Sequence, residues 1–95
     1  MNSVILAGTV TTTPRRVELP GGTVYWTFDM TTPHNDESLG VPVRFEGEAE
    51  PAWLVEGAEV SLVGTVRRRF FRAGGITQSR TEVVADVVVL GAVCR

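Results

Sequence analysis

Two long stretches in the second half of the chain alternate between hydrophobic and polar positions. They are residues 60–71 (VSLVGTVRRRFF) and residues 81–90 (TEVVADVVVL), and both are rich in β-branched residues. This pattern predicts two long strands. The glycine pair within residues 72–80 predicts a turn between them, so we expect the two strands to form a hairpin.

Alternation divides the first of these strands into two faces, because successive side chains of a strand point to opposite sides. One face holds Val60, Leu62, Gly64 and Val66, and the other holds Val63, Thr65, Arg67, Arg69 and Phe71. The second face therefore combines arginines with an aromatic ring.

The N-terminal segment, residues 2–11 (NSVILAGTVT), is apolar on both faces. Val4, Leu6 and Val10 share one face, and Ile5 and Ala7 share the other. A strand buried on both sides needs a second covering layer. A second copy of the chain is one candidate for that layer, and the chain's own loops are the alternative. The first candidate predicts an oligomer interface at Val4, Ile5, Leu6 and Ala7.

Residues 15–31 predict a brief strand, a turn and a longer strand. Residues 15–19 (RRVEL) form the first, and Pro20-Gly21-Gly22 turns the chain back. In residues 23–31 the expected core face holds Val24, Trp26, Phe28 and Met30, and the opposite face holds Tyr25, Thr27 and Asp29. Tyr25 is therefore the outward-facing aromatic, which either packs sideways on the sheet or stacks on a ligand.

The next segments predict a polar loop at residues 32–40, a short strand at residues 41–46 and a weak helix at residues 48–56 that ends at Gly57. Trp53 and Leu54 on that helix would close one end of a barrel. Five antiparallel strands with a short helix between the third and fourth form the Greek-key barrel called the OB-fold. We therefore expect an all-β protein in which residues 1–95 form one OB-fold domain.

Basic residues concentrate in the predicted hairpin, although the formal net charge of the chain is −2. Five of the nine arginines lie in residues 60–81, which contain no acid, so the rest of the chain has four arginines against eleven acids. A basic, aromatic hairpin on an acidic protein suits contact with a polyanion. Arginines that keep a sheet edge soluble explain the charge equally well.

The sequence lacks the residue sets of common catalytic and metal sites. It has one histidine and one cysteine, no glycine-rich phosphate loop before a helix, and no serine in a nucleophile elbow. His34 with Asp36 and Glu37 is a poor ligand set, so we expect no metal, no other cofactor and no enzyme activity. Cys94 cannot form an internal disulfide, which favours a cytoplasmic setting. No apolar run is long enough to span a membrane.

Four segments are distributed in order along nearly the whole chain: NSVILAGTV, GGTVYWTFDM, VEGAEVSLVGTVRRR and, most specifically, TEVVADVVVLG. In these segments the chain resembles the bacterial single-stranded DNA-binding proteins. The resemblance implies an OB-fold, dimers or tetramers joined through the first strand, and single strands held by stacking and by arginine contacts.

The chain departs from that family in its aromatic residues. Members carry stacking aromatics at four places, and only the hairpin place is matched here, by Phe71 with Phe70 beside it. The other three places hold no aromatic residue in register. They are the loop at residues 32–40, the start of the third strand near Gly40, and Glu46 just before Gly47. Phe45 is one position away from the last place and is expected in the core. Stacking contributes about 1–3 kcal/mol per base, so binding without these rings should be mainly electrostatic. The chain also ends without the family's acidic-tipped tail, as does the more loosely similar primosomal replication protein B.

We therefore expect a single-stranded DNA-binding module of DNA replication, recombination or repair that acts as a homodimer or homotetramer away from membranes. RNA is an alternative ligand that the sequence leaves open, and the sequence does not indicate a protein partner. The expected contacts are Arg67, Arg69, Phe71, Arg72 and Arg80 of the hairpin, with Tyr25 and Arg44. The competing hypothesis is a degenerate OB-fold that serves as a protein-interaction subunit of a primosome or replisome and has little affinity for DNA. The acids Glu46, Glu48 and Glu50 favour it.

Overall fold

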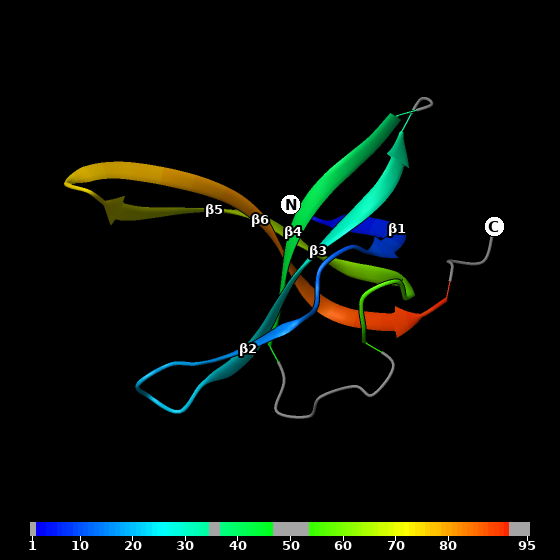
Figure 1. Ribbon diagram of the computed structural model, residues 1–95, viewed down its shortest axis with the longest axis horizontal. Helices are drawn as coiled ribbons and strands as arrows, with labels where there is room; N and C mark the ends of the chain where they lie inside the picture. The colour runs from blue at the N-terminus through cyan, green and yellow to red at the C-terminus, as the bar shows by residue number, and fades with distance from the viewer. Residues whose placement is uncertain (1, 35–36, 47–53, 92–95) are drawn as a thin grey trace.

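The computed structural model describes residues 2–34, 37–46 and 54–91, and six strands account for most of them (Figure 1). In chain order they are β1 (Val4–Val10), β2 (Arg15–Glu18), β3 (Val24–His34), β4 (Glu37–Glu46), β5 (Glu59–Ala73) and β6 (Ile76–Leu90). Across this part of the chain, no helix has the length and apolar character needed to cross a membrane.

The strands form one sheet that closes into a barrel. Their order is β1-β5-β6-β4-β3-β2, and β1 also pairs with β3, so that β1, β5, β6, β4 and β3 complete the circle. This closed, all-β, five-stranded barrel is consistent with the predicted OB-fold. The expectation of purely antiparallel strands is wrong, because β4 and β6 run parallel. β5 pairs with β1 rather than with β4, so its hairpin partner β6 returns beside β4 in the same direction.

The core lies inside the barrel and follows the alternation of the strands. Its buried residues are Val10, Phe28, Met30, Val43, Leu54, Val60, Leu62, Val83, Ala85 and Val88. Phe45 is half-buried and packs against this cluster, as expected from its register. Leu54 also lies in the core as predicted, whereas Trp53 lies outside the described residues.

The β5–β6 hairpin confirms the sequence prediction and is longer than expected. Gly74 and Gly75 form its turn with φ angles of 61° and 79°. A two-residue turn that needs positive φ at both positions matches the right-handed twist of the strands, and glycine adopts this conformation at low cost. The hairpin projects well beyond the barrel (Figure 1).

In the described residues 32–34 and 37–40, strands replace the predicted polar loop. β3 continues to His34, β4 begins at Glu37, and residues 32–34 pair with residues 37–39, including Pro33 with Ser38. Cross-strand pairing satisfies the backbone here although the side chains show no alternation. This hairpin forms a second arm of the molecule (Figure 1).

The predicted helix at residues 48–56 is not found in the part of this segment that the structure describes. Residues 48–53 lie outside that part, and residues 55–58 form a turn in which the Ala58 N–H donates to the Val55 carbonyl (3.1 Å) and Gly57 has a φ of 92°. This turn is hydrogen-bonded to β1. The Gly57 N–H donates to the Val10 carbonyl (2.8 Å), and the Val10 N–H donates to the Ala58 carbonyl (2.9 Å).

Candidate nucleic-acid interface

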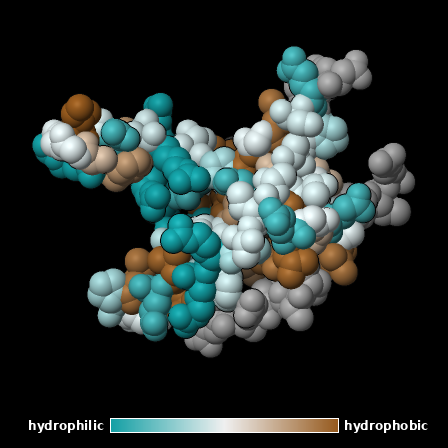
Figure 2. Space-filling view, viewed as in Figure 1, coloured by the Kyte–Doolittle hydropathy of each residue, from teal (hydrophilic) through white to brown (hydrophobic). Residues whose placement is uncertain are grey.

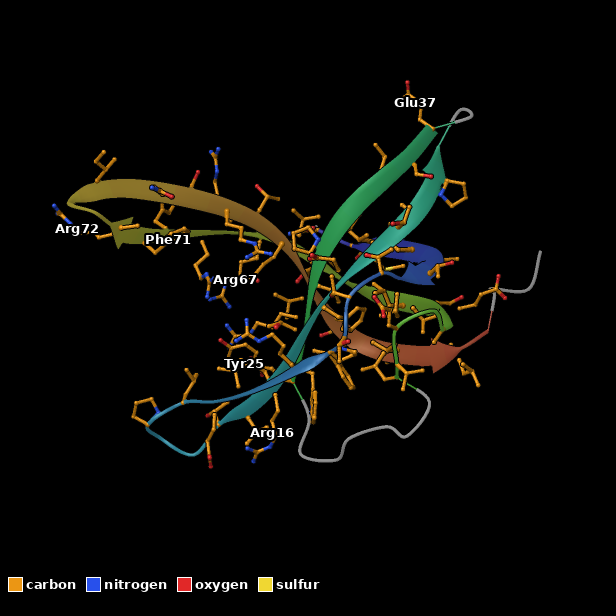
Figure 3. The ribbon with its side chains drawn as sticks, viewed as in Figure 1. Arg16, Tyr25, Glu37, Arg67, Phe71 and Arg72 are labelled. Carbon is orange, nitrogen blue, oxygen red and sulfur yellow. The ribbon has the colours of Figure 1, made fainter. Side chains whose placement is uncertain are left out.

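The two faces of the β5–β6 hairpin carry different residues, as alternation requires. Cross-strand pairs place Arg67 opposite Glu82, Arg69 opposite Arg80, and Phe71 opposite Gln78 on one face. Figure 3 shows Arg67 and Phe71 pointing toward Tyr25, across the space between the hairpin and the β2–β3 strands. This face of the hairpin therefore forms one wall of a groove.

Arg68, Phe70 and Arg72 occupy the opposite face of the same hairpin. Phe70 is 66% exposed, and the Arg68 guanidinium lies 5.8 Å from the centre of its ring. Arg72 sits at the hairpin tip (Figure 3), where its Nη2 donates to the Gly75 carbonyl at 3.1 Å. The structure thus separates Arg72 from Arg67 and Arg69, with which the sequence analysis had grouped it.

A hollow of about 400 Å³ lies at the base of this groove, between the hairpin and the β2–β3 strands. It brings together three of the predicted contact residues, Tyr25, Arg69 and Arg80. A second hollow of about 370 Å³ shares Asp29, Pro42 and Arg80 with the first, so the two adjoin. Figure 2 shows the open space between the β5–β6 hairpin and the β2–β3 strands, with hydrophilic side chains gathered at its base.

Strand β2 supplies residues of the groove that the sequence analysis did not single out. Arg15 and Val17 line the first hollow, together with Thr12 and Thr13 before the strand. Arg16 points to the other side of β2 (Figure 3), where it forms an exposed ion pair with Glu18 at 3.7 Å. The alternation of this short strand is the sequence signal that separates the two arginines.

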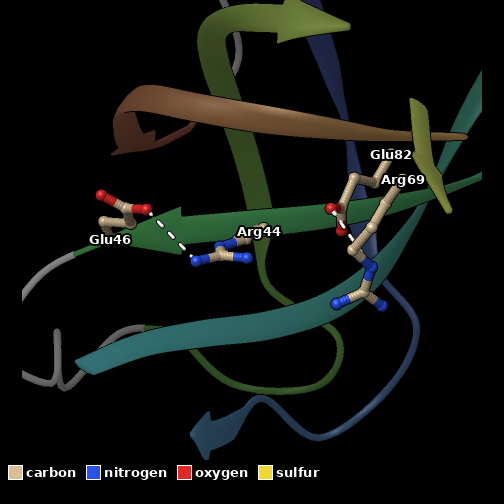
Figure 4. A network of polar contacts seen from close by, with 4 residues as sticks. All are labelled: Arg44, Glu46, Arg69 and Glu82. Atoms are coloured by element: carbon tan, nitrogen blue, oxygen red, sulfur yellow. Dashed lines mark hydrogen bonds and ion pairs between the residues drawn. The ribbon is translucent and has the colours of Figure 1, made fainter. Parts of the chain in front are cut away.

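Tyr25 lies on the groove side of β3, opposite Trp26, as predicted, but it is not an exposed ring. Tyr25 is only 8% exposed, because the Arg44 guanidinium lies 3.8 Å from the centre of its ring. Arg44 Nη2 also donates to Glu46 Oε1 at 3.3 Å (Figure 4). Arg44 is therefore engaged by a ring and a carboxylate. It braces Tyr25 as part of the groove wall.

Two acids lie inside the groove, and neither was predicted from the sequence as a site residue. Glu82 Oε1 is 4.0 Å from Arg69 Nε (Figure 4), and Asp29 Oδ1 is 3.8 Å from Arg80 Nη2. These pairs bring together residues from β5, β6 and β3, which only the strand pairing reveals. Among the described residues, no group of three or more His, Cys, Asp or Glu is arranged to hold a metal ion.

Of the residues predicted to form an oligomer interface, some lie against the core and others lie on an exposed apolar face. Val4 and Leu6 pack against the core, whereas Ile5 is 69% exposed. Ile5 pairs with Val63, which pairs with Val87, so three exposed apolar side chains form one row across β1, β5 and β6. Ala7 lies in the neighbouring row. The outer face of this part of the sheet is therefore apolar.

The fold and the groove define a class of architecture: a closed OB-fold barrel with a groove that arginines and acids line. Among solved structures, a Plasmodium falciparum SSB in complex with ssDNA matches it with a TM-score of 0.81 at 17% sequence identity. The match covers 95% of this chain and 94% of that chain, and it shows that the two share an SSB-like fold. No family model matches the sequence, and a search of curated proteins finds no match.

Proposed function

We propose that the chain binds single-stranded DNA in the groove between the β5–β6 hairpin and the β2–β3 strands. The observation that carries this proposal is that Arg69 lines a hollow together with Arg15 and Arg80, and that Arg67 and Phe71 share its face of the hairpin. Arginine guanidinium groups suit phosphate oxygens, and an aromatic ring accepts a stacked base. The Plasmodium SSB whose structure holds ssDNA has the same fold.

Binding in this groove is mainly electrostatic. Among the groove aromatics, Phe71 is 38% exposed, whereas Tyr25 is buried beneath Arg44. One accessible ring contributes about 1–3 kcal/mol of stacking. With about three or four phosphates engaged, the logarithm of the association constant should fall with the logarithm of the salt concentration with a slope of about −2 to −3.

A titration of a fluorescently labelled single strand, followed by anisotropy at low and high salt, tests the proposal. We expect saturable binding that weakens with this slope, and weaker binding of duplex DNA because a duplex has no unpaired bases to stack. RNA of the same sequence belongs in the same series, since RNA also offers phosphates to arginine and bases to an aromatic ring. Absence of saturable binding at low salt would refute the proposal.

The second candidate function is a protein-interaction subunit with little affinity for DNA. The observation that favours it is the exposed apolar row of Ile5, Val63 and Val87, which suits a protein partner better than a nucleic acid. Within the described residues, β1 from Val4 to Gly8 pairs only with β5, so its other edge is open to a further strand.

We propose that a second copy of the chain covers this edge and face in a homodimer or homotetramer.

DNA replication, recombination or repair is the setting that we propose for such a module. Single strands are exposed in all three processes, and a small barrel with a salt-dependent groove would hold them reversibly. The titration above separates the two candidate functions, because a pure protein-interaction subunit would not bind the labelled strand.

A further inference from the structure

Two carboxylates lie within the groove for which we propose a polyanionic ligand. Asp29 and Glu82 both line the first hollow, and Asp29 also lines the second. An ionised carboxylate accepts hydrogen bonds but donates none, and it repels phosphate. A strand in this groove therefore keeps its phosphates away from the two acids and turns its bases toward them.

Glu82 has an acceptor that lacks a partner in the described part of the protein. The residue is only 6% exposed, and its Oε1 is buried without a hydrogen bond. Arg69 Nε, 4.0 Å away, is also buried without a hydrogen bond, since this distance is too long for one. An unsatisfied buried polar atom is costly, so the site favours a ligand that brings an N–H donor.

Asp29 presents a second carboxylate at the junction of the two hollows. Its backbone is fixed, because its N–H donates to Thr12 Oγ1 (2.9 Å) and its carbonyl accepts from the Thr11 N–H (2.9 Å). Its side chain is about half exposed, and its ion pair with Arg80 at 3.8 Å is also too long for a hydrogen bond. A base in the groove can therefore reach Asp29 without displacing a hydrogen-bonded partner.

The four DNA bases differ in the donors that they offer to a carboxylate. Single strands expose their Watson–Crick edges. Adenine, cytosine and guanine each carry an exocyclic amino group, and a carboxylate readily accepts from the amino group of cytosine. Guanine adds a ring N–H next to its amino group. Thymine has no amino group, and its single N–H lies between two carbonyl oxygens that repel a carboxylate.

We propose that Glu82 and Asp29 make the groove select bases that carry an exocyclic amino group over thymine. This inference rests on the proposed function. Binding exchanges partners: Arg69 and Arg80 leave loose ion pairs for phosphates, and the two carboxylates accept from base amino groups. Each of these four charged groups then has a phosphate or a hydrogen-bond donor as its partner in the complex, which lowers the cost of desolvating it.

The test compares the affinities of the wild-type protein for labelled oligo-dC and oligo-dT of equal length. We expect oligo-dC to bind more tightly, on the order of tenfold. A second pair of strands, oligo-dT with interspersed guanine and the same strand with inosine, isolates the amino group, and the guanine strand should bind more tightly. Equal affinities, or tighter binding of oligo-dT, would overturn the inference alone. Binding of neither homopolymer would overturn the proposed function and the inference with it.

The variant Asp29→Asn with Glu82→Gln tests the assignment to these two residues. A side-chain amide both donates and accepts, so this variant should bind oligo-dC and oligo-dT about equally, and oligo-dT at least as tightly as wild type does. Asp86→Asn is the control, since Asp86 is an exposed acid on the same strand as Glu82 and does not line either hollow. It should keep the wild-type preference.

A preference for oligo-dC that persists in the double variant would overturn the assignment. Should Glu82→Gln prevent folding, Asp29→Asn alone still tests it, because the Asp29 side chain is half exposed. We expect that single variant to reduce the preference, and an unchanged preference would contradict the role of Asp29.

Discussion

Phe70 and Phe71 are neighbours in the sequence but lie on opposite faces of the hairpin, and only Phe71 faces the groove. Phe71→Ala should weaken the binding of a labelled single strand by about 1–3 kcal/mol, because it removes the exposed stacking surface of the groove. Phe70→Ala is the matched control and should leave the anisotropy titration unchanged. Equal losses in the two variants would show that the strand does not follow the groove face.

Trp26 points away from the groove, on the face of β3 opposite Tyr25, and is 6% exposed. A base in the groove cannot stack on it. We therefore predict that saturating oligo-dT changes the tryptophan emission little, even where anisotropy reports binding. Strong quenching that disappears in Trp26→Phe would show that this face of β3 meets the ligand.

Residue alternation alone places Arg67, Arg69 and Phe71 on one face, and the structure agrees. Alternation does not reveal Glu82 and Asp29 as groove residues, because their positions depend on which strands meet. Asp29 on β3 lies beside Arg80 on β6 only after the barrel closes. The charged composition of the groove is therefore a property of the tertiary fold.

At the scale of elements, strand β2 presents a pair of adjacent arginines to opposite sides. Arg15 lines the groove, whereas Arg16 pairs with Glu18 at the surface. Arg15→Gln should weaken binding and reduce the steepness of the salt dependence by about 0.7, the expectation for one phosphate contact. Arg16→Gln should change neither quantity, and it should not affect folding, since exposed ion pairs contribute little.

Strands β5 and β6 approach closely at Gly64, beside a β-bulge. A Cβ added there would overlap the Val84 carbonyl oxygen. Gly64→Ala should therefore lower the free energy of unfolding by about 1–3 kcal/mol, measured by urea denaturation. Gly40→Ala on β4 is the control, because a Cβ there meets no atom within 4 Å, and its stability should stay near wild type. Equal stability of both variants would contradict the close packing at Gly64.

The sequence predicted elements well where local signals and tertiary pairing agree. The glycine pair and the β-branched strands specify the β5–β6 hairpin, and it forms. Residues 32–40 carry no alternation and include Pro33, yet residues 32–34 and 37–40 form strands because the facing strand supplies the hydrogen bonds. Residues 55–58 form a turn that binds β1 through Gly57 and Ala58, and they are not helical. Long-range pairing overrides local propensity in both cases.

Across the molecule, the groove and the apolar row of Ile5, Val63 and Val87 differ in chemistry: the groove is charged and the row is apolar. We predict that the protein forms a dimer or tetramer at micromolar concentration in light scattering, because this row is exposed in one copy. Ile5→Asp should dissociate the oligomer. Leu39→Asp, at an exposed position on the β3–β4 hairpin, should not. A monomeric wild-type protein would contradict the proposed interface.

If a single strand binds the groove face of the hairpin, removing the same charge from the two faces should have unequal effects. The double variant Arg67→Gln with Arg69→Gln removes two positive charges from the groove face. The double variant Arg68→Gln with Arg72→Gln removes two from the opposite face. The measurement is the anisotropy of a labelled single strand across a salt series. We predict that the groove-face variant loses most affinity and about 1.4 of the salt slope, whereas the outer-face variant stays close to wild type. Equal losses, or a larger loss in the outer-face variant, would contradict the account.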